Sequence, residues 1–166
     1  MKTRHINIIF AAILVFTVVL GFAASLQAGD TAPIKPGPRD KCPVCGMFVA
    51  KYPDFITIMT FRDESYVFFD GVKDMMKYYF STQKYTPGKT SEDIATIHVT
   101  DYYTMNPVDG FKAVYVSGSD VFGPMGRELI PFEKKEDAAE FKEDHHGKAV
   151  YGFHDITDDI VKSLDR

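Results

Sequence analysis

YVFFDGVKDMMKYY (residues 66–79) and LIPFEKKEDAAEFK (residues 129–142) decide the fold of this chain, because the two stretches share one pattern. Each begins with an apolar run of the strand type and continues into a segment whose apolar residues recur at helical spacing. When the two are aligned without a gap, Phe69 meets Phe132. The shared pattern indicates a structural unit that occurs twice in the chain.

Further strand-type runs lie on both sides of each stretch. The predicted elements of the first unit are strands at 55–61 and 65–70, a helix with Asp70 as its N-cap, and a strand at 94–100. Those of the second unit are strands at 111–118 and 127–132, a helix at 134–146, and a strand at 148–153, with an amphipathic helix after it. The sequence therefore predicts an α+β fold: two similar ββαβ units, neither able to bury its sheet face alone, pack into one small domain.

The first 28 residues have the layout of a secretory signal peptide. A short basic start precedes a run from Ile6 to Ala28 that contains no charged residue, and small residues close the run. The same run is long enough to remain as an uncleaved anchor, since a spanning helix needs about 20 apolar residues. Prolines and glycines then indicate a flexible linker at residues 29–41. We expect the exported domain to comprise residues 42–166.

The part of the chain after residue 28 is acidic. Two of the 19 lysines and arginines precede it and all 23 aspartates and glutamates belong to it, so its net charge is about −6 at neutral pH. This net negative charge argues against nucleic acid as a partner. The chain also lacks a glycine-rich phosphate loop, a nucleophile elbow and an HExxH motif, which argues against hydrolase or transferase chemistry.

The stretch KCPVCGMFV at residues 41–49 contains both cysteines of the chain, Cys42 and Cys45. Cys-Pro-x-Cys-Gly is typical of a metal knuckle, in which backbone amides point at the sulfurs and the glycine permits a tight bend. Three interpretations of this motif stay open at this point. The cysteines are a thiol–disulfide redox pair, part of a structural zinc site, or the soft ligands of a copper(I) site.

The surroundings of the motif bear differently on the three interpretations. A redox CxxC sits at a helix start after a strand, whereas this one follows a proline-rich segment. Structural zinc needs four ligands, and the adjacent pair His145 and His146 diverge by about 100° on a helix, which makes chelation of one ion by both rare. Copper(I) needs only two or three soft ligands, and Met47 and the loop residue Met125 offer thioethers. By contrast, Met59, Met75 and Met76 fall on predicted strand or helix faces, where we expect them to fill the core.

Six segments of this chain, taken in order, resemble the NosL-type copper chaperones, which are accessory proteins of nitrous oxide reductase. They are CPVCGMFVAKYPDF, FFD before a helix, HVTDY, YVSGS, PMGRELIPF and AAEFKEDHHGKAV, and the likeness runs from about Lys41 to Ile156. The resemblance implies a duplicated ββαβ fold and a protein that is not an enzyme. It further implies a periplasmic protein that carries copper(I) to an ABC-type assembly complex and on to the copper–sulfide centre of nitrous oxide reductase.

The same resemblance implies that the copper(I) ligands lie in the CxxCGM motif and in the MG loop. Those positions are Cys42, Cys45, Met47 and Met125. We rank Cys45 and Met125 first, Met47 next and Cys42 last, because Cys42 borders the linker while Cys45 and Met47 are expected to point into the domain. Weaker additional candidates are His98, His145, His146 and His154.

One feature departs from the family pattern. Many members are lipoproteins attached through a cysteine at the signal-peptide cleavage site, but no cysteine precedes Cys42. We therefore expect a protein that is free in the periplasm, or one held at the inner membrane by an uncleaved N-terminal segment. The departure also leaves the acceptor open to another copper enzyme, such as an oxidase.

Overall fold

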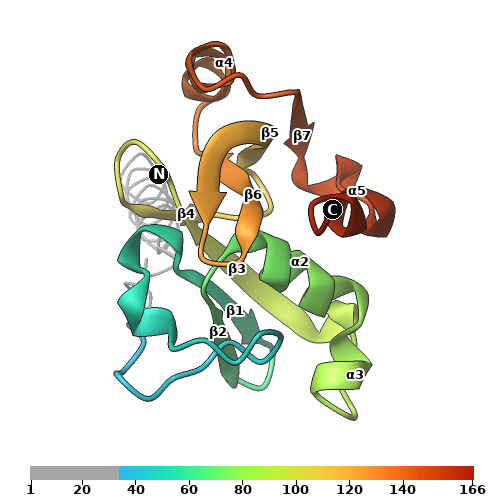
Figure 1. Cartoon of the computed structure of the whole chain (residues 1–166). Helices are drawn as coiled ribbons and strands as arrows, with labels where there is room; N and C mark the ends of the chain where they lie inside the picture. The colour runs from blue at the N-terminus through green and yellow to red at the C-terminus, as the bar shows by residue number, and fades with distance from the viewer. Residues whose placement is uncertain (1–33) are drawn as a thin grey trace, which may run out of the picture. The chain divides into compact units, whose positions relative to one another are not determined.

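The computed structural model describes residues 34–166, so the predicted signal peptide and the first part of the predicted linker lie outside it. The first unit comprises β1 (Thr57–Phe61), β2 (Tyr66–Phe69), α2 (Val72–Phe80), α3 (Thr82–Tyr85), β3 (Ile94–Thr100) and β4 (Pro107–Asp109). The second comprises β5 (Val114–Gly123), β6 (Gly126–Phe132), α4 (Lys135–Asp144), β7 (Ala149–Gly152) and α5 (Asp158–Ser163) (Figure 1). Short 3-10 helices lie at Val49–Lys51, Pro53–Phe55, Ser91–Asp93 and Phe153–Asp155. No helix of this described part is long and apolar enough to cross a membrane.

Each unit contributes one antiparallel sheet, and in both sheets the first strand of the unit is central. The strand orders are β2-β1-β3-β4 and β6-β5-β7. Phe69 lies opposite Thr57 at the end of β2, and Phe132 lies opposite Val114 at the end of β6, so the two aligned phenylalanines hold the same place. The predicted α+β fold of two ββαβ units is confirmed. Among the α-helices and strands of the described residues, only α3 and β4 were not predicted, because elements of four and three residues are too short to show periodicity.

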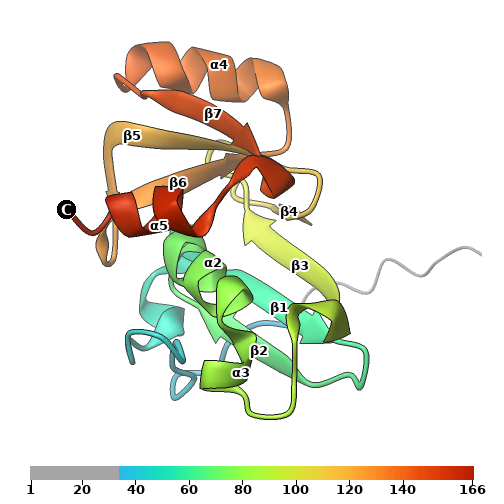
Figure 2. The same cartoon turned by 90° about the vertical axis from the view of Figure 1, so that its right-hand side faces the viewer.

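Helix α2 lies between the two sheets, which also meet directly where β3 contacts β6. Figure 2 shows α4 over one face of the second sheet, α2 and α5 against its other face, and the first sheet beyond α2. Alternation along β5 serves both faces: Val116 packs in the cluster under α4, and Tyr115 packs in the larger cluster with α2. Because α2 contacts β1 and β2 of the first sheet and also β6 of the second, it lies where the two units meet.

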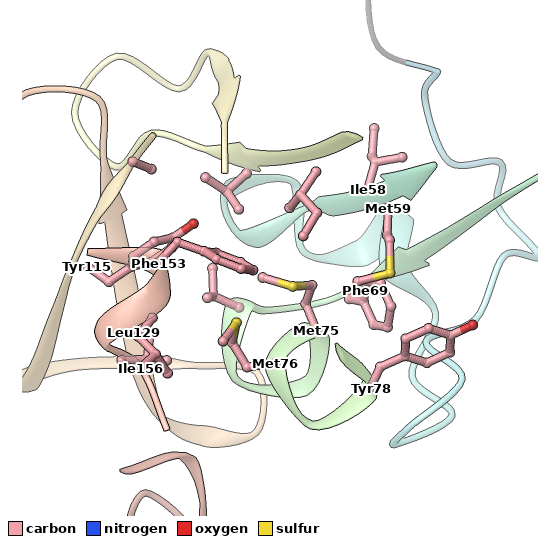
Figure 3. Close-up of a cluster of buried hydrophobic side chains, with 14 of the residues drawn as sticks. Ile58, Met59, Phe69, Met75, Met76, Tyr78, Tyr115, Leu129, Phe153 and Ile156 are labelled. Carbon is pink, nitrogen blue, oxygen red and sulfur yellow. The ribbon is translucent and has the colours of Figure 1, made fainter. Parts of the chain in front are cut away.

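The larger cluster contains the methionines that the sequence predicts in the core. Met59, Met75 and Met76 are fully buried, and Figure 3 shows them among Phe69 and Tyr78. Their thioethers fill space between the first sheet and α2, as flexible side chains of this kind do. The prediction that these three methionines belong to the core is confirmed.

The predicted N-cap of α2 is wrong. The helix begins at Val72 after Gly71, and no side chain on its own N-terminal side caps it. Instead, the amide of Lys73 in its first turn donates to Oε1 of Glu128, at 2.5 Å. Glu128 lies on β6, 55 positions further along the chain, so no local pattern could reveal this acceptor. Asp70 therefore does not cap α2, and its carboxylate has other partners.

Candidate metal centre

The CPVCG segment forms the knuckle that its sequence predicts. The amide of Gly46 donates to the carbonyl of Cys42 at 2.9 Å, and the amide of Cys42 donates to the carbonyl of Met47 at 2.9 Å. Gly46 has a φ of 80°, a left-handed conformation that strains residues with a side chain. The amide of Met47 is directed at the Cys45 sulfur. The backbone therefore supplies N–H donors that stabilise charge on the sulfurs.

Two carboxylates converge on the two thiols. The thiol of Cys42 donates to Oδ2 of Asp74 at 3.5 Å, and the thiol of Cys45 faces both carboxylate oxygens of Asp70, at 3.2 and 3.4 Å. One ligand atom from each of the four residues lies within 4.8 Å of the other three. Both cysteines are free thiols. Two sulfurs and two carboxylates at this spacing form a group that can hold one metal ion.

The burial of the two cysteines overturns the reason for ranking Cys42 last. Cys42 is only 1% exposed and belongs to the main core cluster, whereas Cys45 is half-buried. Lys41 pairs with Phe48, and this pairing carries the chain past the knuckle and turns Cys42 inward. The thiol that was expected to border the linker is therefore the more enclosed of the two.

The environment of the thiols favours their protonated form when no metal is bound. Burial raises the pKa of the Cys42 thiol from 9.0 to about 12, and the carboxylate of Asp70 acts in the same direction. Burial, together with the carboxylates of Asp74 and Asp70, also raises the pKa of the Cys45 thiol. Reactive redox cysteines are found in the opposite, electropositive kind of surroundings. The site is therefore better suited to exchanging protons for a metal cation than to nucleophilic attack.

Binding of a metal ion through these thiols is expected to weaken as the pH falls. Below about pH 9 the metal-free thiols are protonated, so each thiol that becomes a ligand releases one proton, and added protons favour the metal-free state. Two thiolate ligands predict an affinity that rises about 100-fold per pH unit, and one predicts a rise of about tenfold. Competition titrations between about pH 6 and pH 8 measure this slope, which Cys42→Ser should halve on a logarithmic scale. An affinity independent of pH would contradict thiolate ligation.

The two methionine candidates come from different parts of the chain and differ in exposure. Met47 is half-buried and follows the knuckle directly. Met125 is 45% exposed at the turn between β5 and β6, and its carbonyl accepts a bond of 2.7 Å from Nζ of Lys73. Since Lys73 lies on α2 next to Asp74, the turn that carries Met125 is held against the helix that carries a carboxylate of the group.

The histidine candidates lie apart from the cysteines. Among the described residues, the group that could hold a metal contains no histidine. His98 lies in β3 opposite Ile58, and Nδ1 of His145 bonds to Asp120 at 2.9 Å while its ring stacks on Phe141. His146 and His154 are exposed. The structure does not bring these four side chains to the knuckle.

Asp70 and Asp74 are the members of the group that sequence reasoning missed. Their spacing was the available signal, because residues four apart at a helix start lie on the same face. Both carboxylates are buried, at 1% and 3% exposure, which is unusual for aspartate unless the charge has a partner. Each carboxylate accepts from a cysteine, 25 and 32 positions away and beyond the range of any local motif, and Asp74 also pairs with Lys77 at 3.6 Å.

Comparisons with known proteins agree with this architecture. The crystal structure of the copper chaperone NosL from Shewanella denitrificans has a TM-score of 0.66 and 22% identity, covering 76% of this chain and 96% of that one, which shows a shared fold. The solution structure of apo-NosL from Achromobacter cycloclastes has 28% identity and a TM-score of 0.46. The match covers 63% of this chain and 87% of that one. No curated protein matches the chain. The NosL family model matches residues 33–161, most of the sequence, and the chain therefore belongs to the NosL family.

Proposed function

We propose that this protein is a copper(I) metallochaperone, which binds the ion between the cysteine knuckle and the methionine turn and gives it to an apo copper enzyme. Nitrous oxide reductase is the proposed acceptor, reached through an ABC-type assembly complex in the periplasm. Membership of the NosL family and the solved copper chaperone with the same fold support this role. The role is delivery of a cargo ion, without catalysis.

One observation carries the proposal. Two free thiols lie together in a knuckle at the N-terminal start of α2, and the Met125 turn is bonded to the same part of this helix. Thiolates and thioethers are the soft ligands that select copper(I), and the ion is satisfied by few of them. The exposed side chain of Met125 and the half-buried Cys45 leave one side of such a site open. An acceptor could attack the ion from this side through a shared intermediate.

The proposal is tested by copper(I) titration of the reduced protein against a chelator of known affinity. Met125→Ala is expected to weaken binding by about 10- to 100-fold, because it removes a soft ligand. Met105→Ala is the matched control, since Met105 is also 45% exposed, on a loop after β3. The loaded protein should then pass copper to apo nitrous oxide reductase faster than free copper chelate does.

An unchanged affinity in Met125→Ala would remove Met125 from the site without removing the chaperone role. Failure of the wild-type protein to bind copper(I) more tightly than a small thiol would refute the proposed function itself. Binding without transfer to apo nitrous oxide reductase would leave a copper-binding protein with a different acceptor.

The carboxylates favour a second candidate, a zinc ion held by the knuckle. Structural zinc takes four ligands from cysteine, histidine and carboxylate side chains, and Cys42, Cys45, Asp70 and Asp74 supply such a set. The two metals respond differently to Asp70→Asn. The variant should weaken zinc binding by about 10-fold or more, yet change copper(I) affinity little, because oxygen is a poor ligand for the softer ion.

A further inference from the structure

Lys73 joins two parts of the molecule through its two ends. Its amide donates to Oε1 of Glu128 at 2.5 Å, and its ammonium donates to the carbonyl of Met125 at 2.7 Å. The side chain is only 2% exposed, which is rare for lysine unless its charge is satisfied. The first turn of α2 is thereby bonded twice to the β5–β6 hairpin.

Glu128 fits into a space that two glycines leave open. Its Oε1 also accepts from the amide of Leu129 at 2.9 Å. A Cβ at Gly71 would overlap Oε2 of Glu128, and a Cβ at Gly123 would lie 2.9 Å from the same oxygen. Gly71 follows Asp70 directly, and Gly123 lies in the hairpin two residues before Met125. The carboxylate is therefore enclosed between the start of α2 and the end of β5.

The turn at the end of this hairpin is closed by the pairing of Gly123 with Gly126, and it extends beyond the paired strands. Met125 is 45% exposed, and Gly126 has a φ of 88°, as expected of a tight turn. A thioether on an exposed turn contributes to a metal site only if its backbone is held at a defined distance from the other ligands. The bonds of Lys73 and Glu128 join the hairpin to the first turn of α2. That turn carries Asp74 and begins just after Asp70 and Gly71.

We propose that Lys73 and Glu128 are positioning residues for the metal centre: they hold the Met125 turn at the cysteine knuckle, so that thioether and thiols form one preorganised site. This inference rests on the proposed copper(I) site. Residues that orient metal ligands commonly change metal affinity by 10- to 100-fold when they are replaced. Neither residue was singled out in the sequence, because each acts through a backbone group of a distant segment.

A double-mutant cycle on the purified protein tests the inference. Lys73→Met keeps the length of the side chain and removes its bond to Met125. Copper(I) affinity should fall about tenfold in the wild-type background but less than about twofold when Met125→Ala is also present. Asp165→Asn is the matched control, because Asp165 is the other partner of the Lys73 ammonium, at 3.2 Å, and does not touch the turn. It should leave the affinity unchanged.

Gly123→Ala is a second variant that moves the same turn, by pressing a methyl group against Glu128. It should reproduce the loss that depends on Met125, even if Lys73→Met fails to fold. An equal loss in both backgrounds, for either variant, would overturn the inference, because the effect would then be general destabilisation. No loss in the wild-type background would overturn it as well.

A measurement on the metal-free protein separates this inference from the proposed function. Hydrogen exchange at the amides of Gly123, Met125, Gly126 and Arg127 should be about tenfold faster in Lys73→Met than in the wild type or Asp165→Asn. Faster exchange in a protein that binds no copper(I) would support the role of Lys73 in holding the Met125 turn and would refute the proposed function. Unchanged exchange would refute that role of Lys73, whatever the protein binds.

Discussion

Cys45→Ser will lower the copper(I) affinity by more than about 100-fold, beyond the upper end of what residues outside the ligand set cost. Serine has nearly the size of cysteine, so the half-buried position and the knuckle turn are kept. The hydroxyl oxygen is a hard ligand that copper(I) binds poorly. Asp70, which faces Cys45 at 3.2 Å, cannot substitute for the lost sulfur, because a carboxylate is a hard ligand too.

The measurement is a competition titration of the reduced variant at fixed pH, with folding checked by circular dichroism. Cys42→Ser is the companion variant, because Cys42 belongs to the same group. Comparable losses in both variants would assign both thiols to the ion. A loss confined to Cys42→Ser would move the site to the enclosed thiol, and a Cys45→Ser protein of native affinity would contradict the first-ranked ligand.

Phe69→Ala will lower the free energy of unfolding by about 3–5 kcal/mol, and Phe132→Ala will lower it by a similar amount. Both side chains are fully buried at the end of the second strand of their unit. Phe69 packs edge-on to Tyr78, with ring centroids 5.2 Å apart, and Phe132 lies 4.9 Å from Phe141. Each truncation leaves a cavity that close-packed neighbours cannot fill completely.

Urea denaturation followed by fluorescence and circular dichroism measures both values. Phe122→Ala is the control, since Phe122 is 61% exposed and should change the free energy by less than about 0.5 kcal/mol. Both core variants should unfold in a single transition. Two transitions in Phe132→Ala would contradict the packing of the units into one domain. In this domain the rings of Tyr102, from the first unit, and Phe132 pack with their centroids 6.0 Å apart.

The duplicated fold could be predicted because its signals are local. Apolar spacing within single strands and helices placed β3 at the predicted residues 94–100 and put the helix after Asp70. The elements that were missed, α3 and β4, are too short for any spacing to repeat. The exposed Met125 could also be assigned to a loop from its glycine and proline neighbours.

The candidate site could be predicted only in part, because its contacts connect distant positions. The CxxCG spacing identified the thiols and their turn. Asp70 was instead assigned to helix capping, which is the most local role that an aspartate in this position can play. Its actual partner is Cys45, and the cap comes from Glu128. A single sequence does not show which distant residue, Asp70 or Glu128, takes the capping role.

The bond between Lys73 and Glu128 has a consequence for the order of folding. A chain that leaves the ribosome N-terminus first presents α2 before Glu128, the acceptor in its first turn, which follows Lys73 by 55 residues. A nine-residue helix is marginal by itself, and closing so long a loop has an entropic cost. We therefore expect the first turn of α2, which carries Asp74, to become fixed only after β6 has paired. A half-made chain exposes its cysteines without the finished centre, so metal capture waits for the whole domain.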